Sequence, residues 1–356
     1  IRPQDFLPAL APFRIMLSLA ILVLLFFLVK TIFNRDKIEV IPTAQNVLMF
    51  ALLLVVPLSD ISNFRITDAW DSLNTFLTLL LPFFLIVSIT GDKYKLLYWC
   101  ITFAGLFLAI NGIIQHYNGV DLFGVTPMSG RIEWVGIFSD PNDFALLLVS
   151  SLPIILFYLF KDDKHLFMKI GLIAMLVVFF MAIYFTNSRG GYLAVIAVLA
   201  SFAFKKWGLK KGIIFGSILI VIALLVAPSR MAEITPHGSS ASGRVYAWMR
   251  GFELLKTHPV FGIGMHKFTD YYSKAAHSAF IKCVAELGLV GLFIWVGLIY
   301  TSFRDLIRIE NSSADQTLIL YSRITQVSII GFLASAVFLS QTYNPIVYIL
   351  FGISGT

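Results

Sequence analysis

Three positions combine residue types that could carry chemistry on a charged substrate, namely Arg189, Arg244 and His277. An arginine guanidinium binds diphosphate oxygens through two parallel hydrogen bonds. A neutral histidine can accept a proton as a general base. Together these side chains predict a site that holds a diphosphate and deprotonates a hydroxyl group.

Arg189 follows Thr186-Asn187-Ser188 and precedes Gly190-Gly191, between two apolar runs. Such a short connection fixes the guanidinium at the headgroup layer of a membrane. The two glycines are expected to break the helix and let the backbone approach a ligand closely. The alternative is an interfacial arginine whose side chain reaches lipid phosphate.

Arg244 begins a stretch with apolar residues at helical spacing: Val245, Trp248, Phe252 and Leu255. This pattern predicts an amphipathic helix that lies on the membrane surface. A plain surface helix is the alternative.

His277 lies where a long polar segment enters an apolar run. The partial positive charge of a helix N-terminus would keep its imidazole neutral; the alternative is a solvated interfacial histidine. The irregular spacing of the other histidines in this segment, without cysteines or clustered carboxylates, argues against a metal: His237, His258 and His266. Gly262-Ile263-Gly264 is too short for a phosphate loop. We expect neither a metal nor another cofactor.

The composition defines the class of protein that must position these residues. Of the 356 residues, 58% are hydrophobic and 13% are charged, about half the charged fraction of a soluble domain. Lipid must therefore cover much of the chain, which predicts an all-α polytopic membrane protein. The net charge of +7 is not evidence for nucleic-acid binding, because in a membrane protein the location of the basic residues in the loops decides what the charge means.

Eleven apolar runs approach the roughly 20 residues that a spanning helix needs. They cover 13–33, 45–60, 73–91, 96–114, 143–160, 169–187, 191–204, 212–228, 278–303, 320–340 and 344–355. We interpret 1–356 as a single transmembrane domain, with 229–277 as a large loop inserted between spanning helices. Cys100 and Cys283 should lie near opposite faces and remain unpaired.

The basic residues orient the chain, because cytoplasmic loops collect Lys and Arg. Alternate connections, starting after the first run, hold fifteen of them, Lys205 and Arg323 included. The short connections of the other parity hold three: Arg65, Arg131 and Arg189. The first set is therefore predicted to be cytoplasmic. The segment 229–277 falls on the opposite side, where its length exempts it from the rule. Because the chain starts without Met, we also expect a further helix before Ile1.

At this point the sequence resembles the O-antigen ligase/polymerase family of bacterial cell-surface polysaccharide enzymes. Two patterns carry the resemblance: Arg189-x-x-x-Leu193, and His277-Ser278 followed after nine residues by Gly288-Leu289-Val290-Gly291. The turn Phe138-Ser139-Asp140-Pro141-Asn142 is also typical of the family. The resemblance spans roughly residues 130–300.

The resemblance implies about twelve spanning helices in a glycosyltransferase C-type arrangement in the bacterial inner membrane. It implies transfer of a glycan from an undecaprenyl-diphosphate donor at the periplasmic face, without nucleotide sugar or metal. A ligase would use lipid A-core as acceptor, and a polymerase would use a second lipid-linked glycan.

Carried over by position, Arg189 and Arg244 would clamp the donor diphosphate and His277 would act at the acceptor hydroxyl. A one-step attack would invert the anomeric centre. Further candidate contacts to glycan or phosphate are Arg131, Asp140, Tyr246, His266 and Lys282.

The motifs slightly favour a ligase over a polymerase. A transporter of lipid-linked glycan would place ionisable groups near the bilayer midplane; here the spanning runs are almost free of charge, apart from Lys282 and Glu286 near one end. A non-catalytic scaffold remains a further alternative. A metal-dependent oligosaccharyltransferase would need grouped acidic residues on the outer side, and nothing in the sequence groups them.

Overall fold

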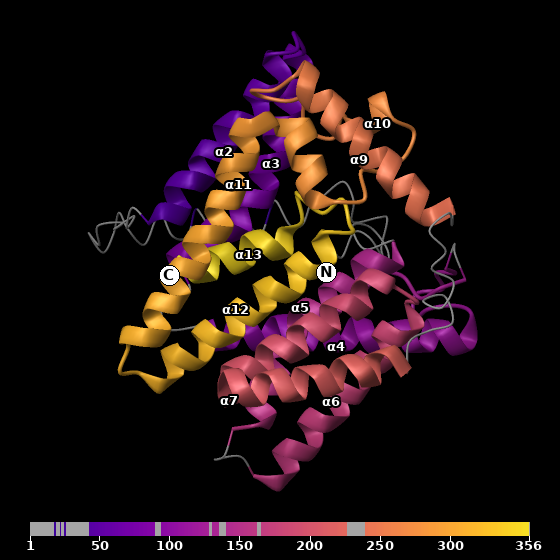
Figure 1. Cartoon of the computed structure of the whole chain (residues 1–356), viewed down its shortest axis with the longest axis vertical. Coiled ribbons are helices and arrows are strands. Elements are labelled where there is room, and N and C mark those ends of the chain that lie inside the picture. The colour runs from indigo at the N-terminus through magenta and orange to yellow at the C-terminus, as the bar shows by residue number, and fades with distance from the viewer. Residues whose placement is uncertain are drawn as a thin grey trace.

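The computed structural model describes residues 43–89, 94–127, 130–134, 140–161, 165–225 and 239–355, together with Ser18, Leu22 and Leu25. Throughout this part the chain forms α-helices and connecting segments (Figure 1). Most of the predicted run 13–33 and the start of the predicted turn at Phe138-Ser139 lie outside the described residues.

The helices follow one another in the order α2 (Ala44–Ile61), α3 (Ile66–Ile89), α4 (Tyr94–Asn118), α5 (Pro141–Leu159), α6 (Leu166–Phe185), α7 (Arg189–Leu225), α9 (Ser239–Thr257), α10 (Phe268–Tyr271), α11 (Ala279–Ser312), α12 (Gln316–Ala336) and α13 (Pro345–Ser354). Each predicted apolar run from 45–60 onward overlaps one of these helices over its described residues.

Within the described part, seven helices are long and apolar enough to cross a membrane: α2, α4, α5, α6, α7, α11 and α12. The chain is therefore a polytopic α-helical membrane protein, as its composition predicts. The predicted run 344–355 forms a shorter apolar helix. Helix α13 has 10 residues and reaches only about 15 Å, half the thickness of the hydrocarbon core.

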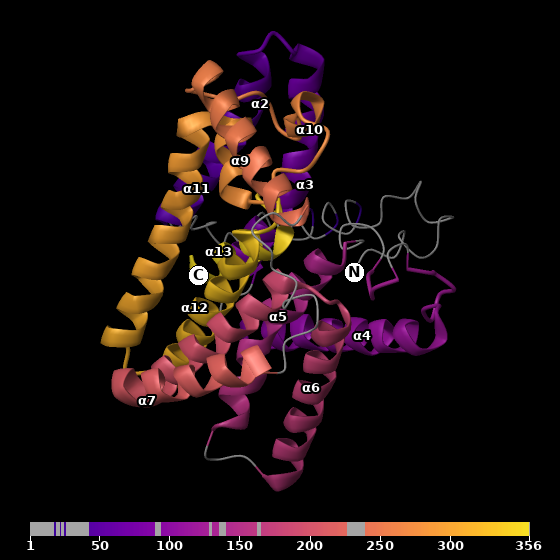
Figure 2. The same ribbon diagram turned by 45° about the vertical axis from the view of Figure 1, so that its right-hand side comes forward.

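The helices pack in two groups that α12 joins. Helices α2, α3, α11 and α13 surround one core, which contains Phe76, Trp295 and Tyr348. Helices α4, α5, α6 and α7 surround another, which contains Phe144 and Phe179. Figures 1 and 2 show α2 and α3 in the upper part of the molecule, α4 to α7 in the lower part, and α11 running down one side from the upper part towards α7. Almost all of α5 is buried, so it forms the centre of the second group.

Helix α7 is a helical hairpin. Gly208 has φ 78° and ψ 178°, which interrupts the helix. A Cβ at Gly212 would lie 2.7 Å from the Cα of Phe204, and the Trp207 and Phe215 rings are 4.7 Å apart. The two halves therefore pack against each other, and the runs 191–204 and 212–228 are two helical segments, as predicted.

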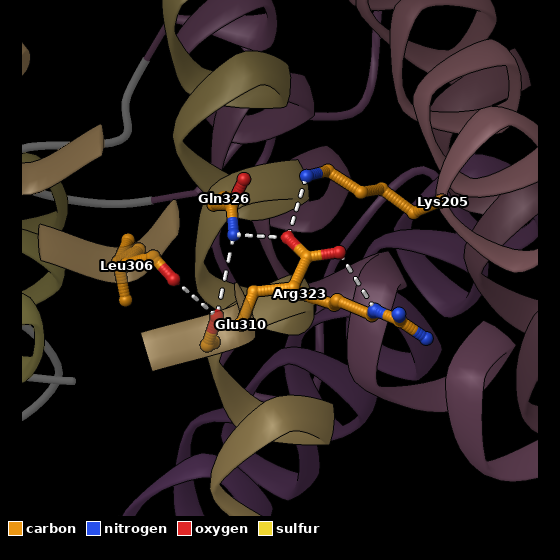
Figure 3. Close-up of polar contacts among 6 residues, drawn as sticks. Lys205, Leu306, Glu310, Arg323 and Gln326 are labelled. Atoms are coloured by element: carbon orange, nitrogen blue, oxygen red, sulfur yellow. Dashed lines mark hydrogen bonds and ion pairs between the residues drawn. The ribbon is translucent and has the colours of Figure 1, made fainter. Parts of the chain in front are cut away.

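A carboxylate near the end of α11 joins three helices. Glu310 accepts hydrogen bonds from Lys205 of α7 at 2.7 Å and from Arg323 of α12 at 2.9 Å (Figure 3). Gln326 of α12 donates a third at 3.0 Å. The charge rule assigned Lys205 and Arg323 to connections on the same side of the membrane, and these connections indeed lie at the same end of the helices.

Helix α11 is interrupted by Gly288, the first glycine of the second sequence motif. Gly288 has φ 65° and ψ −164°, a conformation that strongly favours glycine. The interruption leaves backbone groups of α11 available to another segment. Leu289 N–H donates to the Pro259 carbonyl at 2.9 Å, and Val290 N–H donates to the Val260 carbonyl at 3.2 Å.

The segment 259–264 returns two hydrogen bonds to the same interruption. Ile263 N–H donates to the Ala285 carbonyl and Gly264 N–H to the Glu286 carbonyl, each at 3.0 Å. A Cβ at Gly262 would lie 2.4 Å from the Glu286 carbonyl carbon. The glycine at 262 therefore allows close packing of backbone on backbone, whereas a Cβ at Gly264 would lie 2.1 Å from a carboxylate oxygen of Asp60 on α2. Together these contacts fix the long loop to α11.

We expect Gly288→Ala to destabilise the protein by about 3 kcal/mol, because a left-handed non-glycine residue alone costs about 1–3 kcal/mol. The added Cβ would also lie 2.3 Å from the Val260 carbonyl oxygen. The measurement is the melting temperature of the purified protein in detergent. Gly171→Ala on α6 is the control, because its Cβ would meet nothing within 4 Å; equal melting temperatures for the two variants would contradict this account of α11.

Candidate functional site

Arg189 is the first residue of α7 and is half-buried. A tight turn precedes it, in which Asn187 has a positive φ of 48°. The Ser188 hydroxyl accepts a hydrogen bond from Gly191 N–H at 3.1 Å and so caps the helix. Sixteen residues separate Arg189 from Lys205, about 24 Å along a helix, so Arg189 lies at the end of the molecule opposite the Glu310 cluster.

The two glycines after Arg189 have a different role from the one expected. Gly190 and Gly191 lie inside the first turn of α7 and do not break it. A Cβ at Gly191 would lie 2.7 Å from the Ala145 Cβ, whereas one at Gly190 would lie 3.7 Å from the Phe338 Cβ. The glycines therefore bring α7 close to α5 and to the segment after α12.

Arg244 lies on α9 close to Arg189. Its guanidinium carbon is 5.7 Å from the centroid of the Phe338 ring, a cation–π distance. Burial, and secondly the charge of Arg189, lower the pKa of Arg244. Neither arginine forms an ion pair with a described residue. Two neighbouring, partly desolvated cations without a carboxylate partner favour a bound anion.

Helix α9 is present as predicted, but apolar residues lie on two of its sides. Ala247 and Leu254 are buried, and a Cβ at Gly251 would lie 2.3 Å from the Ile281 Cγ2 of α11. Val245 and Phe252 are exposed, with Tyr246 and Met249 on the same side. The helix is therefore docked on α11, which fixes Arg244 in place.

Lys274 is a third cation at the site, and no motif or spacing around it in the sequence indicates this role. Its ammonium nitrogen lies 3.9 Å from the position that a Cβ at Gly243 would take, next to Arg244. Its charge also acts on His277. Three cations from α7, α9 and the loop before α11 thus converge.

His277 lies just before α11, whose N-cap residue is Ser278. Its backbone has a positive φ of 50°, and its N–H donates to the Ser340 hydroxyl at 2.8 Å. The His277 ring therefore projects from a turn at the start of α11 that the segment after α12, distant in the sequence, holds in place.

Several groups around His277 shift its protonation. Burial, followed by the charge of Arg244, lowers the pKa of His277; Asp140 acts in the opposite direction, and Lys274 lowers the pKa further. The net shift is downward, so the imidazole is neutral at neutral pH and can accept a proton.

Asp140 and Arg131 hold the connections around the site. The Asp140 carboxylate is exposed and caps α5 by accepting from Asn142 N–H at 2.7 Å. Arg131 donates to the Thr186 carbonyl at 2.7 Å and to the Asn142 side chain at 3.4 Å. Arg131 thus joins the start of α5 to the turn before Arg189, a positioning role.

His266 and Lys282 lie together beside Tyr343. The Lys282 ammonium is 3.5 Å from His266 Nδ1 and 5.1 Å from the centroid of the Tyr343 ring. His266 is an exposed residue, but its ring packs 5.0 Å from the Tyr343 ring. Burial of the imidazole ring and, secondly, the positive charge of Lys282 lower the pKa of His266 to about 4. Tyr246, in contrast, is 62% exposed on α9, and no described contact joins it to these residues.

Left-handed backbone is concentrated around these residues. The described part has four non-glycine residues with positive φ, and three of them are Asn187, His266 and His277. Such conformations cost free energy and gather at functional sites. This supports grouping the two histidines and the turn before Arg189 in one site.

The segment 338–343 between α12 and α13 contacts most members of the group. Phe338 packs under Arg244, Ser340 binds the His277 backbone, and Tyr343 contacts His266 and Lys282. This segment could not be recognised as part of the site from the sequence, because its first residues continue the apolar run 320–340. The Thr342 hydroxyl, which donates to the Ala279 carbonyl at 2.7 Å, also fixes it to α11.

No group of three or more His, Cys, Asp or Glu residues in the described part could hold a metal ion. Cys100 is exposed and Cys283 is buried, and both are free thiols, as predicted.

The fold and the site define a polytopic membrane protein with a cationic site beside a neutral histidine. Residues 172–296 match the family model described as O-Antigen ligase. A stretch of 82 residues is 30% identical to the Exopolysaccharide production protein ExoQ of Rhizobium meliloti (strain 1021), covering 18% of this chain and 19% of that relative. The match thus spans about a fifth of the curated relative. The predicted resemblance to the O-antigen ligase/polymerase family is confirmed over residues 172–296.

Charge substitutions should shift the titration of His277 in opposite directions. Lys274→Gln removes a cation and should raise the pKa of His277, whereas Asp140→Asn removes an anion and should lower it. Asparagine at 140 still caps α5. The measurement is an NMR pH titration of histidine-labelled protein, with His277 assigned by its Gln variant. Glu253→Gln, at an exposed position of α9, is the control. Shifts of the same sign in both variants would refute this electrostatic arrangement.

Proposed function

We propose that the protein is a glycosyltransferase that transfers a glycan from an undecaprenyl-diphosphate donor to an acceptor at the periplasmic face of the bacterial inner membrane. One observation carries the proposal: Arg189, Arg244 and Lys274 converge beside a neutral His277 at one end of a polytopic helical bundle. The match of residues 172–296 to the family model described as O-Antigen ligase, and the similarity to an exopolysaccharide production protein, support an enzymatic role.

The cations act on the leaving group. As the bond between the anomeric carbon and the diphosphate oxygen breaks, the electron pair stays with the lipid diphosphate. Arg189 and Arg244 would hold the developing charge through bidentate hydrogen bonds, and Lys274 would add a point charge. Their positions are fixed before the reaction by the cap of α7 and by the packing of α9 on α11.

His277 acts on the nucleophile. The acceptor hydroxyl oxygen forms the new bond to the anomeric carbon, and its proton passes to the neutral imidazole. The two-sided arrangement, with cations at the leaving group and a base at the acceptor, requires attack from the face opposite the diphosphate. The proposed reaction therefore inverts the anomeric centre, and a product that keeps the donor configuration would exclude it.

The charge pattern supports placing the site on the periplasmic side. The Lys205 and Arg323 connections, which the charge rule assigns to the cytoplasm, meet at Glu310. Arg189 starts the same helix that carries Lys205 and therefore lies at the far end. A diphosphate on a membrane lipid would lie at the depth of that end.

The identity of the acceptor distinguishes two candidate activities, those of a ligase and of a polymerase. We propose ligation to lipid A-core, because the family model that matches is described as O-Antigen ligase. The match to an exopolysaccharide production protein favours the second candidate, polymerisation on another lipid-linked glycan.

The decisive assay uses the purified protein with a lipid-diphosphate-linked glycan, EDTA and no nucleotide. Release of undecaprenyl diphosphate that requires lipid A-core identifies a ligase, whereas chain growth on a second donor identifies a polymerase. Absence of release with any acceptor, from protein that binds the donor, would favour a transporter or a scaffold instead.

Arginine substitutions should remove transfer without unfolding the protein. Arg189→Ala and Arg244→Ala are each expected to lower kcat by about 10²-fold or more, the usual loss for a transition-state donor. Arg→Lys should also impair transfer, because the bidentate fork is lost. Arg250→Lys is the control, because Arg250 on the same helix forms an exposed ion pair with Glu253. Full activity of either lysine variant at the site would argue against the clamp.

The His277→Ala variant should lower kcat by about 10²–10⁴-fold, the usual contribution of a general base, while donor binding changes little. In the wild-type protein, kcat should fall as the pH drops through the lowered pKa of His277, because protonation removes the base. Steady-state kinetics across pH, together with donor binding, would measure both effects. His258→Ala in the same loop is the control, and an unchanged kcat for His277→Ala would remove this residue from the catalytic role.

A further inference from the structure

A second set of polar side chains adjoins His277 along the segment 338–343. Ser340 binds the His277 backbone, and the next residue, Gln341, lies within hydrogen-bonding reach of Asp143 in the first turn of α5. The Lys282 ammonium of α11 is close enough to act electrostatically on Asp143. All three side chains belong to half-buried residues, so they are held by the protein but still reach its surface.

The geometry of this set is fixed from several directions. The Gln341 amide oxygen accepts from the Asn344 side chain at 2.9 Å, so the amide nitrogen is the group that can donate to Asp143. Lys282 is held between the His266 ring and the Tyr343 ring. These side chains therefore come from α5, α11 and the segment between α12 and α13, as at a preorganised binding site.

The charge of this set differs from that of the arginine site. Three cations, Arg189, Arg244 and Lys274, meet on one part of the site and suit a diphosphate. The second set combines a carboxylate, an amide and an ammonium group, and thus offers both acceptors and donors. Such a mixture suits a neutral ligand with many hydroxyl groups, and a site built to bond hydroxyls discriminates strongly between ligands.

We propose that Asp143, Gln341 and Lys282 form a subsite that binds the hydroxyl groups of a sugar residue next to the reacting bond. This inference rests on the proposed function, because it assigns to that transferase the part of the site that selects the glycan. The sugar belongs either to the donor glycan or to the acceptor, and the two sources are separable kinetically.

The test compares Asp143→Asn and Lys282→Met with the wild-type protein in three measurements. These are the Kd of undecaprenyl diphosphate without sugar, the KM of the lipid-linked glycan donor, and the KM of the acceptor. We expect the KM of one glycan substrate to rise about 10-fold or more, with the Kd of the bare lipid diphosphate unchanged. A rise in the donor KM assigns the subsite to the donor, and a rise in the acceptor KM assigns it to the acceptor.

The controls are the same substitutions at exposed positions, Asp71→Asn on α3 and Lys256→Met on α9. If Asp143→Asn fails to fold, Lys282→Met carries the test. Unchanged KM values for both substrates would overturn the subsite. A loss of affinity for the bare lipid diphosphate as large as the rise in KM would also overturn it. In either case, transfer by the wild-type protein would still support the proposed function. Absence of both binding and transfer in the wild-type protein would overturn both proposals.

Discussion

The break in α11 at Gly288 is the constraint on which the site depends. Buried backbone groups must be hydrogen-bonded, and a helix that opens beside a membrane must find new partners for the groups it exposes. The segment 259–264 supplies them through four backbone hydrogen bonds. The same bonds fix the end of the loop that carries His266, Lys274 and His277. A glycine in a sequence motif thus determines where the candidate base lies, although it touches no substrate.

The segment 338–343 completes the arrangement from the other side. It places an aromatic ring under Arg244, a hydroxyl on the His277 backbone and a second ring beside His266 and Lys282. Because α12 joins the two groups of helices, this segment also connects Arg189 on α7 with the loop before α11. The site is therefore shared between both halves of the bundle, and its geometry depends on how they pack.

The sequence predicts the parts of this architecture that depend on composition and local pattern. The apolar runs mark the helices, the charge rule assigns the connections of Lys205 and Arg323 to the same side of the membrane, and the two short runs after Arg189 correspond to the two segments of α7. It also identifies Arg189, Arg244 and His277, which the fold brings together. Lys274, Ser340 and Gln341 were out of reach, because their importance comes from contacts between segments that are distant in the chain. The roles expected for Gly190 and Gly191 were wrong for a related reason: a glycine pair is compatible with both a helix break and close packing, and only the position of Ala145 on α5 decides between them.

The contrast between the two parts of the site bears on how one architecture could serve different acceptors. A lipid diphosphate is the same leaving group in a ligase and in a polymerase, so the cationic part need not change between them. Glycans differ in the number and direction of their hydroxyl groups. A carboxylate, an amide and an ammonium group distinguish them, because each forms hydrogen bonds with particular hydroxyl groups. Asp143 lies in the first turn of α5 and Gln341 lies between two helices, so substitutions there would alter hydrogen bonding without disturbing the break at Gly288 or the arginines. On the proposed mechanism, specificity can therefore vary at one part of the site while the chemistry is preserved at the other.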